Sequence, residues 1–387
     1  MSVAPDVVIV GAGIVGAACA RECARRGLKT TVVDSGTIGG GATAAGMGHI
    51  VVMDDSPMQL ALTSYSQRLW RELAPELGAD AEFEACGTLW VAADDEEMCE
   101  VRRKKAVYAS AGIAAEVLDS QAVADAEPHL RRPLAGGLLV ASDAVLYPPC
   151  AARYLMCEAH QMGATLLPGH RVVSAQKGRV RFENGTELHT ARIVNACGVD
   201  SVRLTPGLPI RKRRGHLVIT DRYPGWIRRQ IVELGYLKSA HSITTDSVAF
   251  NVQPRKTGQL LIGSSREYAS EGAEVNHSLL TAMIARAQEY LPGIGELQAI
   301  RVWTGFRAAT PDKLPLIGPW PLDHSLYLAT GHEGLGITTS LGTAKLLVGT
   351  MFGESTEIEA EAYLPRRVLQ GHTAPDERAP ESESSHG

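Results

Sequence analysis

Three glycines near the start of the chain, Gly11, Gly13 and Gly16, have the spacing G-x-G-x-x-G. They follow the β-branched apolar run of residues 7–10, which is short enough to predict a buried strand. In a strand–turn–helix unit the first glycine permits a tight turn, the second lets backbone N–H groups approach a diphosphate, and the third brings the helix close to the sheet. Asp34 ends a second predicted strand about 20 residues later, where a carboxylate binds a ribose diol. These residues together predict a dinucleotide site.

A second glycine-rich stretch, residues 35–48, follows Asp34 directly. Two-domain NAD enzymes have no obvious use for it, whereas a flavin dinucleotide needs small residues that let backbone amides reach its ring system. A flexible linker is the alternative, but Ala42, Ala44 and Met47 make the stretch unusually apolar for a linker. The sequence therefore favours a flavin over a nicotinamide.

Length and composition are those of an ordinary globular protein of two domains: 387 residues, 45% hydrophobic and 21% charged. A net charge of -5 gives no reason to expect nucleic acid or an anionic membrane as a partner. No apolar run predicts a transmembrane helix, and the N-terminus does not resemble a secretory signal, so we expect a cytoplasmic location. The seven cysteines include no C-x-x-C pair, which argues against a disulfide framework and against a Cys-ligated metal site.

Capping signals place several elements. Ser56-Pro57 predicts a helix to about residue 77, Asp94 with Glu97 predicts a helix to about residue 110, and Asn276 predicts the cap of a helix to about residue 291. The basic run of residues 102–105 on the second helix is interpreted as a solvated face. Asn184-Gly185 predicts a hairpin turn, and the polar residues 366–387 are expected to form a disordered tail.

Glycine segments near residues 11, 40 and 334 occur together with IVNACG, WTGFRAATPDKLPLIG and ATGHEGLGIT, which begin at residues 193, 303 and 329. This combination resembles the FAD-dependent D-amino-acid oxidase (DAO) superfamily over about residues 5–365. The segment GATAAGMGHIVVMDDSP, residues 41–57, is most similar to the branch with glycine oxidase, the FAD subunit of hydrogen cyanide synthase, opine oxidase subunits and D-hydroxyproline dehydrogenase subunits. The last of these is the closest resemblance.

The resemblance implies an α/β fold with a Rossmann-like FAD-binding domain of discontinuous segments and a second, α+β substrate domain with an antiparallel or mixed sheet. The FAD-binding domain is expected over residues 1–79, 143–214 and 301–365, and the substrate domain over residues 80–142 and 215–300. The residues implied to contact FAD lie in glycine-rich turns and near strand ends: Gly11, Gly13, Ile14, Val15, Gly16, Asp34, Ser35, Gly41, Ala42, Thr43, Gly46, Met47, Gly48, Val172, Ala196, Gly198, Arg307, Gly331, Gly334, Leu335, Gly336 and Ile337.

The resemblance also implies oxidation of an amine at the carbon that bears it, with hydride transfer to flavin N5. Arg307 occupies the WxGxR position of the carboxylate-binding arginine, although a surface or inter-strand arginine is the alternative. His49 follows the flavin loop and is a second catalytic candidate, for flavin contact or for taking the amine proton, although a lone histidine is more often structural. His332 is a candidate of the same kind, with the same structural alternative. Asn251 and Glu333 complete the expected substrate contacts.

Two positions depart from glycine oxidase. Gly334 stands where that enzyme has a second arginine, and Asn251 stands where it has a tyrosine that contacts the substrate carboxylate. No cysteine lies near residues 318–321, where monomeric sarcosine oxidases attach their flavin, so FAD is expected to bind non-covalently.

We therefore expect an FAD-dependent dehydrogenase of a small cyclic D-amino acid, such as D-proline or cis-4-hydroxy-D-proline. The resemblance implies partner subunits, a larger flavin subunit and a small ferredoxin-like subunit. A free-standing glycine or sarcosine oxidase that produces hydrogen peroxide is one alternative, and a flavin-holding relay subunit with an idle amine site is another. A NAD-linked dehydrogenase is the remaining one.

Overall fold

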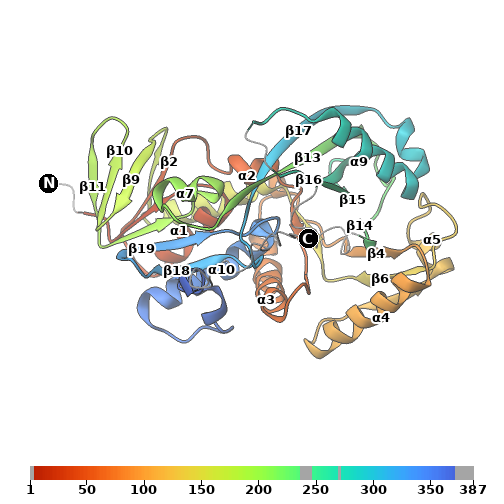
Figure 1. Ribbon diagram of the computed structural model, residues 1–387, viewed down its shortest axis with the longest axis horizontal. Coiled ribbons are helices and arrows are strands. Elements are labelled where there is room, and N and C mark those ends of the chain that lie inside the picture. Colours follow the sequence, from red (N-terminus) through yellow and green to blue (C-terminus); the bar gives the residue numbers. More distant parts are fainter. Residues whose placement is uncertain (1–3, 236–245, 269–271, 371–387) are drawn as a thin grey trace, which may run out of the picture.

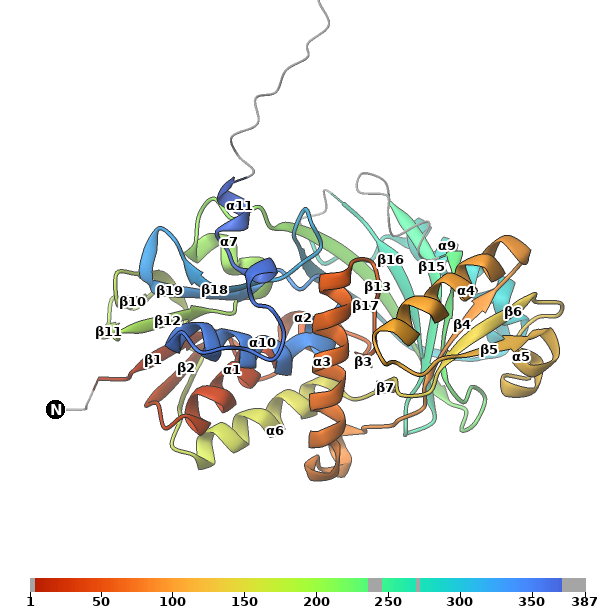
Figure 2. The same ribbon diagram turned by 90° about the horizontal axis from the view of Figure 1, so that it is seen from below.

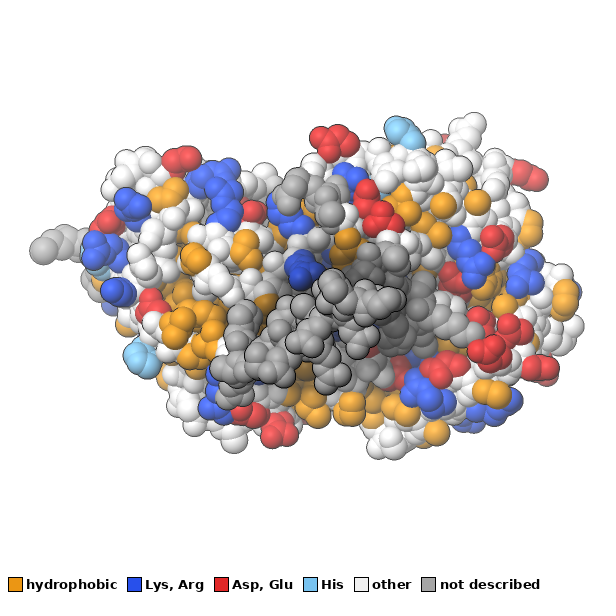
Figure 3. Space-filling view, in the orientation of Figure 1, with side chains coloured by type: hydrophobic (Ala, Val, Ile, Leu, Met, Phe, Trp, Pro, Cys, Tyr) orange, Lys and Arg blue, Asp and Glu red, His pale blue; other side chains and the backbone are white. Residues whose placement is uncertain are grey.

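The computed structural model describes residues 4–235, 246–268 and 272–370, which form two lobes, each built around one large sheet (Figure 1). Charged side chains of both signs are interspersed on the face shown in Figure 3. No helix among the described residues is long and apolar enough to cross a membrane.

The first lobe is built on a six-stranded sheet with the strand order β18-β19-β12-β1-β2-β8. All neighbours in it are parallel except the pair β18 and β19. The strands are β1 (Val7–Val10), β2 (Thr30–Asp34), β8 (Thr165–Pro168), β12 (Arg192–Asn195), β18 (Leu316–Trp320) and β19 (Asp323–Thr330). The six strands come from four separate parts of the chain, residues 7–34, 165–168, 192–195 and 316–330, so this lobe is discontinuous in sequence, as predicted.

Alternation along β1 explains how this sheet is covered on both faces. Val7 and Ile9 pack against the helices α1 (Ile14–Arg25), α6 (Pro148–Gln161) and α10 (Gly336–Phe352), which lie together in Figure 2. Val8 and Val10 pack against the small antiparallel sheet of β9 (Val172–Gln176), β10 (Arg179–Phe182) and β11 (Glu187–His189). The sheet is therefore buried on both sides.

The second lobe is built on an eight-stranded sheet with the order β17-β13-β16-β15-β14-β4-β6-β5. Its neighbours are antiparallel except for β14 and β4, which are parallel. The strands are β4 (Thr88–Ala92), β5 (Glu116–Asp119), β6 (Gly136–Val140), β13 (Arg211–Arg222), β14 (Gln230–Glu233), β15 (Ser247–Pro254), β16 (Gln259–Arg266) and β17 (Ala299–Ala309). Helix α9 (His277–Tyr290) packs on one face, and α4 (Asp95–Ser110) packs on the other.

The remaining elements are short or connect the lobes. Among the described residues they are α2 (Gly41–Ala45), β3 (His49–Ile50), α3 (Pro57–Leu73), α5 (Ser120–Ala126), β7 (Ala144–Val145), α7 (Ser201–Leu204) and α11 (Arg367–Gln370), with five short 3-10 segments. Helix α3 stands between the lobes in Figure 2 and packs against α10. Strand β17 lies in the eight-stranded sheet, so residues 301–309 share a sheet with residues assigned to the substrate domain. The division into domains at residues 79, 142, 214 and 300 stays a prediction.

The structure confirms the helix caps and the hairpin turn that the sequence predicts. Ser56 caps α3, Asp94 caps α4 and Asn276 caps α9, each through its side chain. Asn184 and Gly185 form the turn between β10 and β11. Helix α3 ends at Leu73, earlier than predicted, because Pro75 has no N–H with which to continue it.

Two predictions need correction. The basic run on α4 is solvated at Arg102, Arg103 and Lys105, but the Lys104 side chain is 0% exposed. Lys104 shares the buried face of the helix with Val101 and Tyr108, because residues three or four apart lie on one side of a helix. In the tail predicted to be disordered, residues 367–370 form α11, and residues 371–387 lie outside the described part.

Candidate active site

The predicted dinucleotide turn connects β1 to α1. Gly11 has φ +110°, and a Cβ on it would lie 2.5 Å from the carbonyl oxygen of Ala196. A Cβ at Gly16 would lie 1.9 Å from the carbonyl oxygen of Gly11. Helix α1 has Gly13 at its N-cap, so no side chain caps its first N–H groups. These features fit a diphosphate held by backbone N–H groups at a helix N-terminus.

Asp34 brings the predicted ribose site to this turn. Its carboxylate accepts hydrogen bonds from the N–H of Ala12 at 2.6 Å and from that of Gly36 at 2.7 Å. Ile14 N–H donates to the Thr43 hydroxyl at 3.0 Å, which ties the second glycine-rich stretch to the start of α1. The described structure places the other predicted contacts of this region around the same strand ends: Ser35 after β2, Val172 at the start of β9, and Ala196 and Gly198 after β12.

The second and third glycine-rich segments lie against each other. A Cβ at Gly46 would lie 2.7 Å from Ile337 Cδ1, at the start of α10. Thr338 donates to the carbonyl oxygen of His49 at 2.8 Å, which joins the same two segments. Helix α10 begins after Leu335 without a side-chain cap, and Gly331 turns with φ +79°. The predicted residues of both segments, from Gly41 to Gly48 and from Gly331 to Ile337, thus meet between the lobes.

A cavity opens beside these segments and is lined from both lobes. Its walls combine polar and apolar side chains: His49, Val51, Met53, Asp55, Gln59, Trp90, Gln230, Val232, Asn251, Arg266, Arg307, Lys313, His332, Glu333, Gly334 and Leu335. Every residue predicted to contact substrate is in this lining, including His49, Asn251, Arg307, His332 and Glu333.

Arg307 lies on β17 between two glycines, and its guanidinium packs directly over one of them, Gly215. A Cβ at Gly215, on the neighbouring β13, would lie 2.4 Å from Arg307 Nη1. On the other side, a Cβ at Gly334 would lie 3.7 Å from Arg307 Nε. Arg307 Nη1 donates to the carbonyl oxygen of Ser265 at 3.0 Å. The guanidinium is therefore oriented by backbone, and a fork of this kind can bind a carboxylate through two parallel hydrogen bonds.

His49 is held in its neutral form. Burial lowers its pKa to about 4, and the charge of Arg307 acts in the same direction. The carboxamides of Gln230 and Gln253 oppose this shift, although neither makes a hydrogen bond of normal geometry to the ring. Asn251 Nδ2 lies 3.4 Å from Nε2, and the buried Nδ1 has no hydrogen-bond partner among the described residues. A neutral imidazole with an unpartnered nitrogen is suited to hydrogen bonding with a ligand.

His332 and Glu333 have different surroundings. The His332 ring is buried with Nε2 2.9 Å from the Thr343 hydroxyl, and burial lowers its pKa to about 3. Glu333 has φ +50° and forms an ion pair with Arg213, which is opposite Arg307 in the sheet register. His332 therefore contributes a neutral group to the cavity, and Glu333 neutralises a second arginine next to Arg307.

Several cavity residues were not predicted from the sequence: Val51, Met53, Asp55, Gln59, Trp90, Gln230, Val232, Arg266 and Lys313. Residues 51–55 come shortly after His49, in the segment that resembles the flavin loop of the family. This position could have indicated that they line the cavity. Trp90 and Gln230 are 140 positions apart in the numbering and meet because β4 pairs with β14. No local motif marks either residue.

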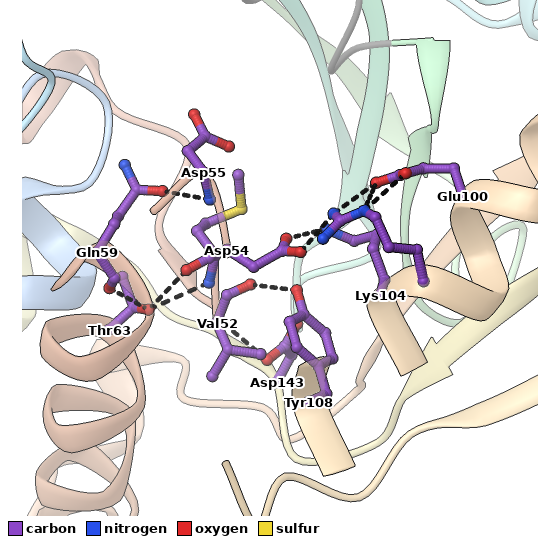
Figure 4. Close-up of polar contacts among 11 residues, drawn as sticks. Val52, Asp54, Asp55, Gln59, Thr63, Glu100, Lys104, Tyr108 and Asp143 are labelled. Carbon is purple, nitrogen blue, oxygen red and sulfur yellow. Dashed lines mark hydrogen bonds and ion pairs between the residues drawn. The ribbon is translucent and has the colours of Figure 1, made fainter. Parts of the chain in front are cut away.

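Figure 4 shows how the segment of residues 51–55 is held between the lobes. Val51, Met53 and Asp55 line the cavity, whereas Val52 and Asp54 are bonded away from it. Val52 N–H donates to Asp143 at 3.2 Å, and the Val52 carbonyl accepts from Tyr108 at 3.1 Å.

Asp54 forms the strongest link from this segment to α4. Its carboxylate pairs with the fully buried Lys104 and, at 2.7 Å, with Arg103. Burial alone would raise the pKa of Asp54, but the charge of Lys104 and the hydrogen bonds from both cations keep that pKa below its usual value. The ammonium of Lys104 also lies 4.6 Å from the centre of the Trp90 ring, so the same cation supports a cavity wall.

The fold and the site together define a class of protein: a two-lobed oxidoreductase with a dinucleotide cofactor and a cavity between its lobes. Residues 6–349 match the sequence model of the family described as "FAD dependent oxidoreductase" (DAO). The chain belongs to this family, which confirms the predicted superfamily, the enzyme class and FAD as the cofactor.

Individual relatives and structures cover almost the whole chain. The hydrogen cyanide synthase subunit HcnC of Pseudomonas aeruginosa is 28% identical over 94% of this chain and 96% of its own length. Glycine oxidase of the same organism is 28% identical over 93% of this chain and 98% of its own length. The crystal structure of L-proline dehydrogenase from P. horikoshii has a TM-score of 0.86 at 22% identity, covering 96% of this chain and 99% of that chain, which confirms the predicted fold class.

Replacement of Lys104 by methionine is expected to lower the free energy of unfolding by roughly 3 kcal/mol, because the buried Asp54 carboxylate loses its main counter-charge. Urea unfolding followed by circular dichroism measures this. The exposed neighbour provides the control, since Lys105→Met is expected to change the free energy of unfolding by less than about 0.5 kcal/mol. Adding Asp54→Asn to Lys104→Met should restore part of the loss, and a double variant less stable than the single one would contradict this account.

His332 should make the protein less stable as the pH falls. Its pKa in the folded chain is about 3 against an ordinary 6.5, so between these values the unfolded chain binds the proton that the folded chain does not. Stability is therefore full above about pH 6.5 and is lost towards pH 3. His332→Gln is expected to reduce the slope of unfolding free energy against pH by up to about 1.4 kcal/mol per unit. Urea titrations at several pH values in this range test it, and identical slopes would refute it.

Proposed function

We propose that this chain oxidises the C–N bond of a small amino acid, with D-proline or cis-4-hydroxy-D-proline as the preferred substrate class. The observation that carries the proposal is the position of Arg307, a backbone-oriented guanidinium in a cavity whose other walls include a neutral histidine and several apolar side chains. The resemblance to D-hydroxyproline dehydrogenase subunits supports the choice of a cyclic D-amino acid.

Each substrate group has a counterpart in the cavity. Arg307 binds the carboxylate bidentately and so fixes the position of the α-carbon. His49 faces the amine, and the low pKa of its ring keeps the imidazole neutral at neutral pH, so that no second positive charge opposes the amine. The apolar side chains of Val51, Met53 and Leu335 contact the methylene groups and exclude water.

Bound FAD supplies the acceptor for the hydride that leaves the α-carbon. With the proton that leaves nitrogen, this converts the C–N bond of the substrate into C=N. We assign the diphosphate to the turn of Gly11–Gly16, the ribose to Asp34, and the ring edge to residues 42–48. The uncapped first turn of α10 at Gly336 and Ile337 would stabilise negative charge on the cofactor. We also propose that FAD is bound non-covalently.

The name of one relative, a subunit of hydrogen cyanide synthase, supports partner subunits for this chain as well. We propose that electrons pass to a larger flavin subunit and a small ferredoxin-like subunit. Copurification of the tagged chain from its own source with two such proteins is the expected result. A free-standing oxidase remains the second candidate, because glycine oxidase aligns over almost the same length.

Anaerobic flavin reduction by a substrate panel tests the function and separates the candidates. The panel contains D-proline, cis-4-hydroxy-D-proline, L-proline, glycine and sarcosine, and air is admitted after each reduction. Bleaching by a D-proline compound with slow reoxidation supports the dehydrogenase. Bleaching by glycine or sarcosine with fast reoxidation supports the oxidase. If none of the five bleaches the flavin, the relay subunit with an idle site replaces both.

Arg307→Lys should raise the substrate concentration for half-maximal flavin reduction by about 100-fold, because a lysine gives a point charge in place of two parallel hydrogen bonds. The exposed Arg301 on the same strand provides the matched control, and Arg301→Lys is expected to leave that concentration within about 2-fold of the wild type. Stopped-flow absorbance of the flavin gives both values. Equal concentrations for the wild type and Arg307→Lys would remove Arg307 from the carboxylate site.

A further inference from the structure

One face of the eight-stranded sheet carries polar atoms for which the described structure provides no partner. Trp90 on β4 is opposite Val232 on β14, and Val232 is opposite Asn251 on β15, so the three form a row across adjacent strands. Gln230 stands two residues before Val232, on the same face. All four line the cavity that contains Arg307.

Three of these residues are almost completely buried. The exposed fractions are 2% for Trp90, 2% for Gln230 and 6% for Asn251. Trp90 Nε1, Gln230 Oε1 and Asn251 Oδ1 are buried atoms without a hydrogen bond of normal geometry among the described residues, and the Gln230 carboxamide also interacts with the His49 ring, whose pKa it raises. Leaving such a group unsatisfied is costly, so several of them on one cavity wall point to a ligand that pairs with them.

The chemistry of these atoms restricts the ligand. The indole N–H can only donate a hydrogen bond, whereas the two amide oxygens can only accept one. A hydroxyl group complements the donor and one of the two acceptors, because its oxygen accepts from the indole N–H and its single hydrogen donates to one amide oxygen. The proposed function assigns the substrate carboxylate to Arg307 and the amine to His49, which leaves this wall for another polar group. Val232, in the middle of the row, offers an apolar surface to the adjoining carbon atoms.

We propose that Trp90, Gln230 and Asn251 form a hydroxyl-recognition wall that selects a cyclic amino acid with a hydroxyl group on its ring over the unsubstituted ring. The inference rests on the proposed function, because it takes the carboxylate to be anchored at Arg307. It adds the specificity: the substrate is a hydroxylated ring, and Gln230 with Trp90 determines the preference. The ammonium of Lys104 lies against the Trp90 ring, 4.6 Å from its centre, and supports the indole from the α4 side.

Two ligands that cannot be oxidised test this without depending on turnover. Cyclopentanecarboxylate has the ring and the carboxylate, and cis-3-hydroxycyclopentanecarboxylate adds one hydroxyl in the position that corresponds to cis-4-hydroxy-D-proline. Isothermal calorimetry on the full-length, FAD-loaded protein measures both affinities. We expect the hydroxylated ligand to bind about 10- to 100-fold more tightly.

Variants identify the source of the preference. Gln230→Met, which keeps the length of the side chain, is expected to bring the two affinities within about 3-fold of each other. Trp90→Phe deletes the N–H and keeps an aromatic ring, so it should reduce the preference even if Gln230→Met folds poorly. Thr88, opposite Gln230 in the register but outside the cavity lining, provides the control: Thr88→Val should retain the full preference.

The outcomes separate the two proposals. Equal affinity of the wild type for both ligands, with loss of binding in Arg307→Lys, overturns the hydroxyl-recognition wall and leaves the carboxylate anchor in place. A preference that survives in both Gln230→Met and Trp90→Phe also overturns the wall. If the wild type binds neither ligand and its flavin is not reduced by the amino-acid panel, the proposed function fails and the wall fails with it.

Discussion

Backbone contacts too close for any Cβ atom determine how the cofactor end of this molecule is built. Gly16 lies against the carbonyl of Gly11, Gly11 against the carbonyl of Ala196, and Gly48 against the carbonyl of Leu146. Steric repulsion is short-ranged and steep, so each of these contacts excludes every other residue type unless the backbone moves. The contacts bring together segments that are distant in sequence, and the cavity stands where those segments meet. The orientation of Arg307 and the neutral state of His49 both follow from this close assembly.

The features that the sequence predicted correctly depend on short-range chemistry. The turn after β1, the three side-chain caps and the hairpin at Asn184 each involve residues within a few positions of one another. The cavity residues next to these signals, such as His49 and His332, could also be found because the resemblance gave their positions. The basic run on α4 was misread because a short run of four basic residues, taken by itself, predicts a solvent-exposed surface. Only the periodicity of the whole helix places Lys104 on its buried face.

The remainder of the site depends on strand order, which no local signal encodes. Gln230 begins a short strand of four buried residues, with nothing in its neighbours to distinguish it from a core position. It reaches the cavity because β14 lies between β15 and β4. The site is thus shared: the six-stranded lobe supplies the cofactor turns, the edge strand β17 supplies Arg307, and the central strands β4, β14 and β15 supply polar side chains. Each contribution is fixed by a different part of the fold.

The alternation along residues 51–55 joins the cavity wall to the contact between the lobes. Val52 and Asp54 carry the bonds that attach the segment to Tyr108, Asp143 and Lys104, while Val51, Met53 and Asp55 line the cavity. Val51 and Met53 also belong to a buried hydrophobic cluster, and Asp55 pairs with Lys313. A change of size or charge at these three positions therefore alters the packing of the segment together with the shape of the cavity, so substrate specificity and stability are coupled in this part of the chain.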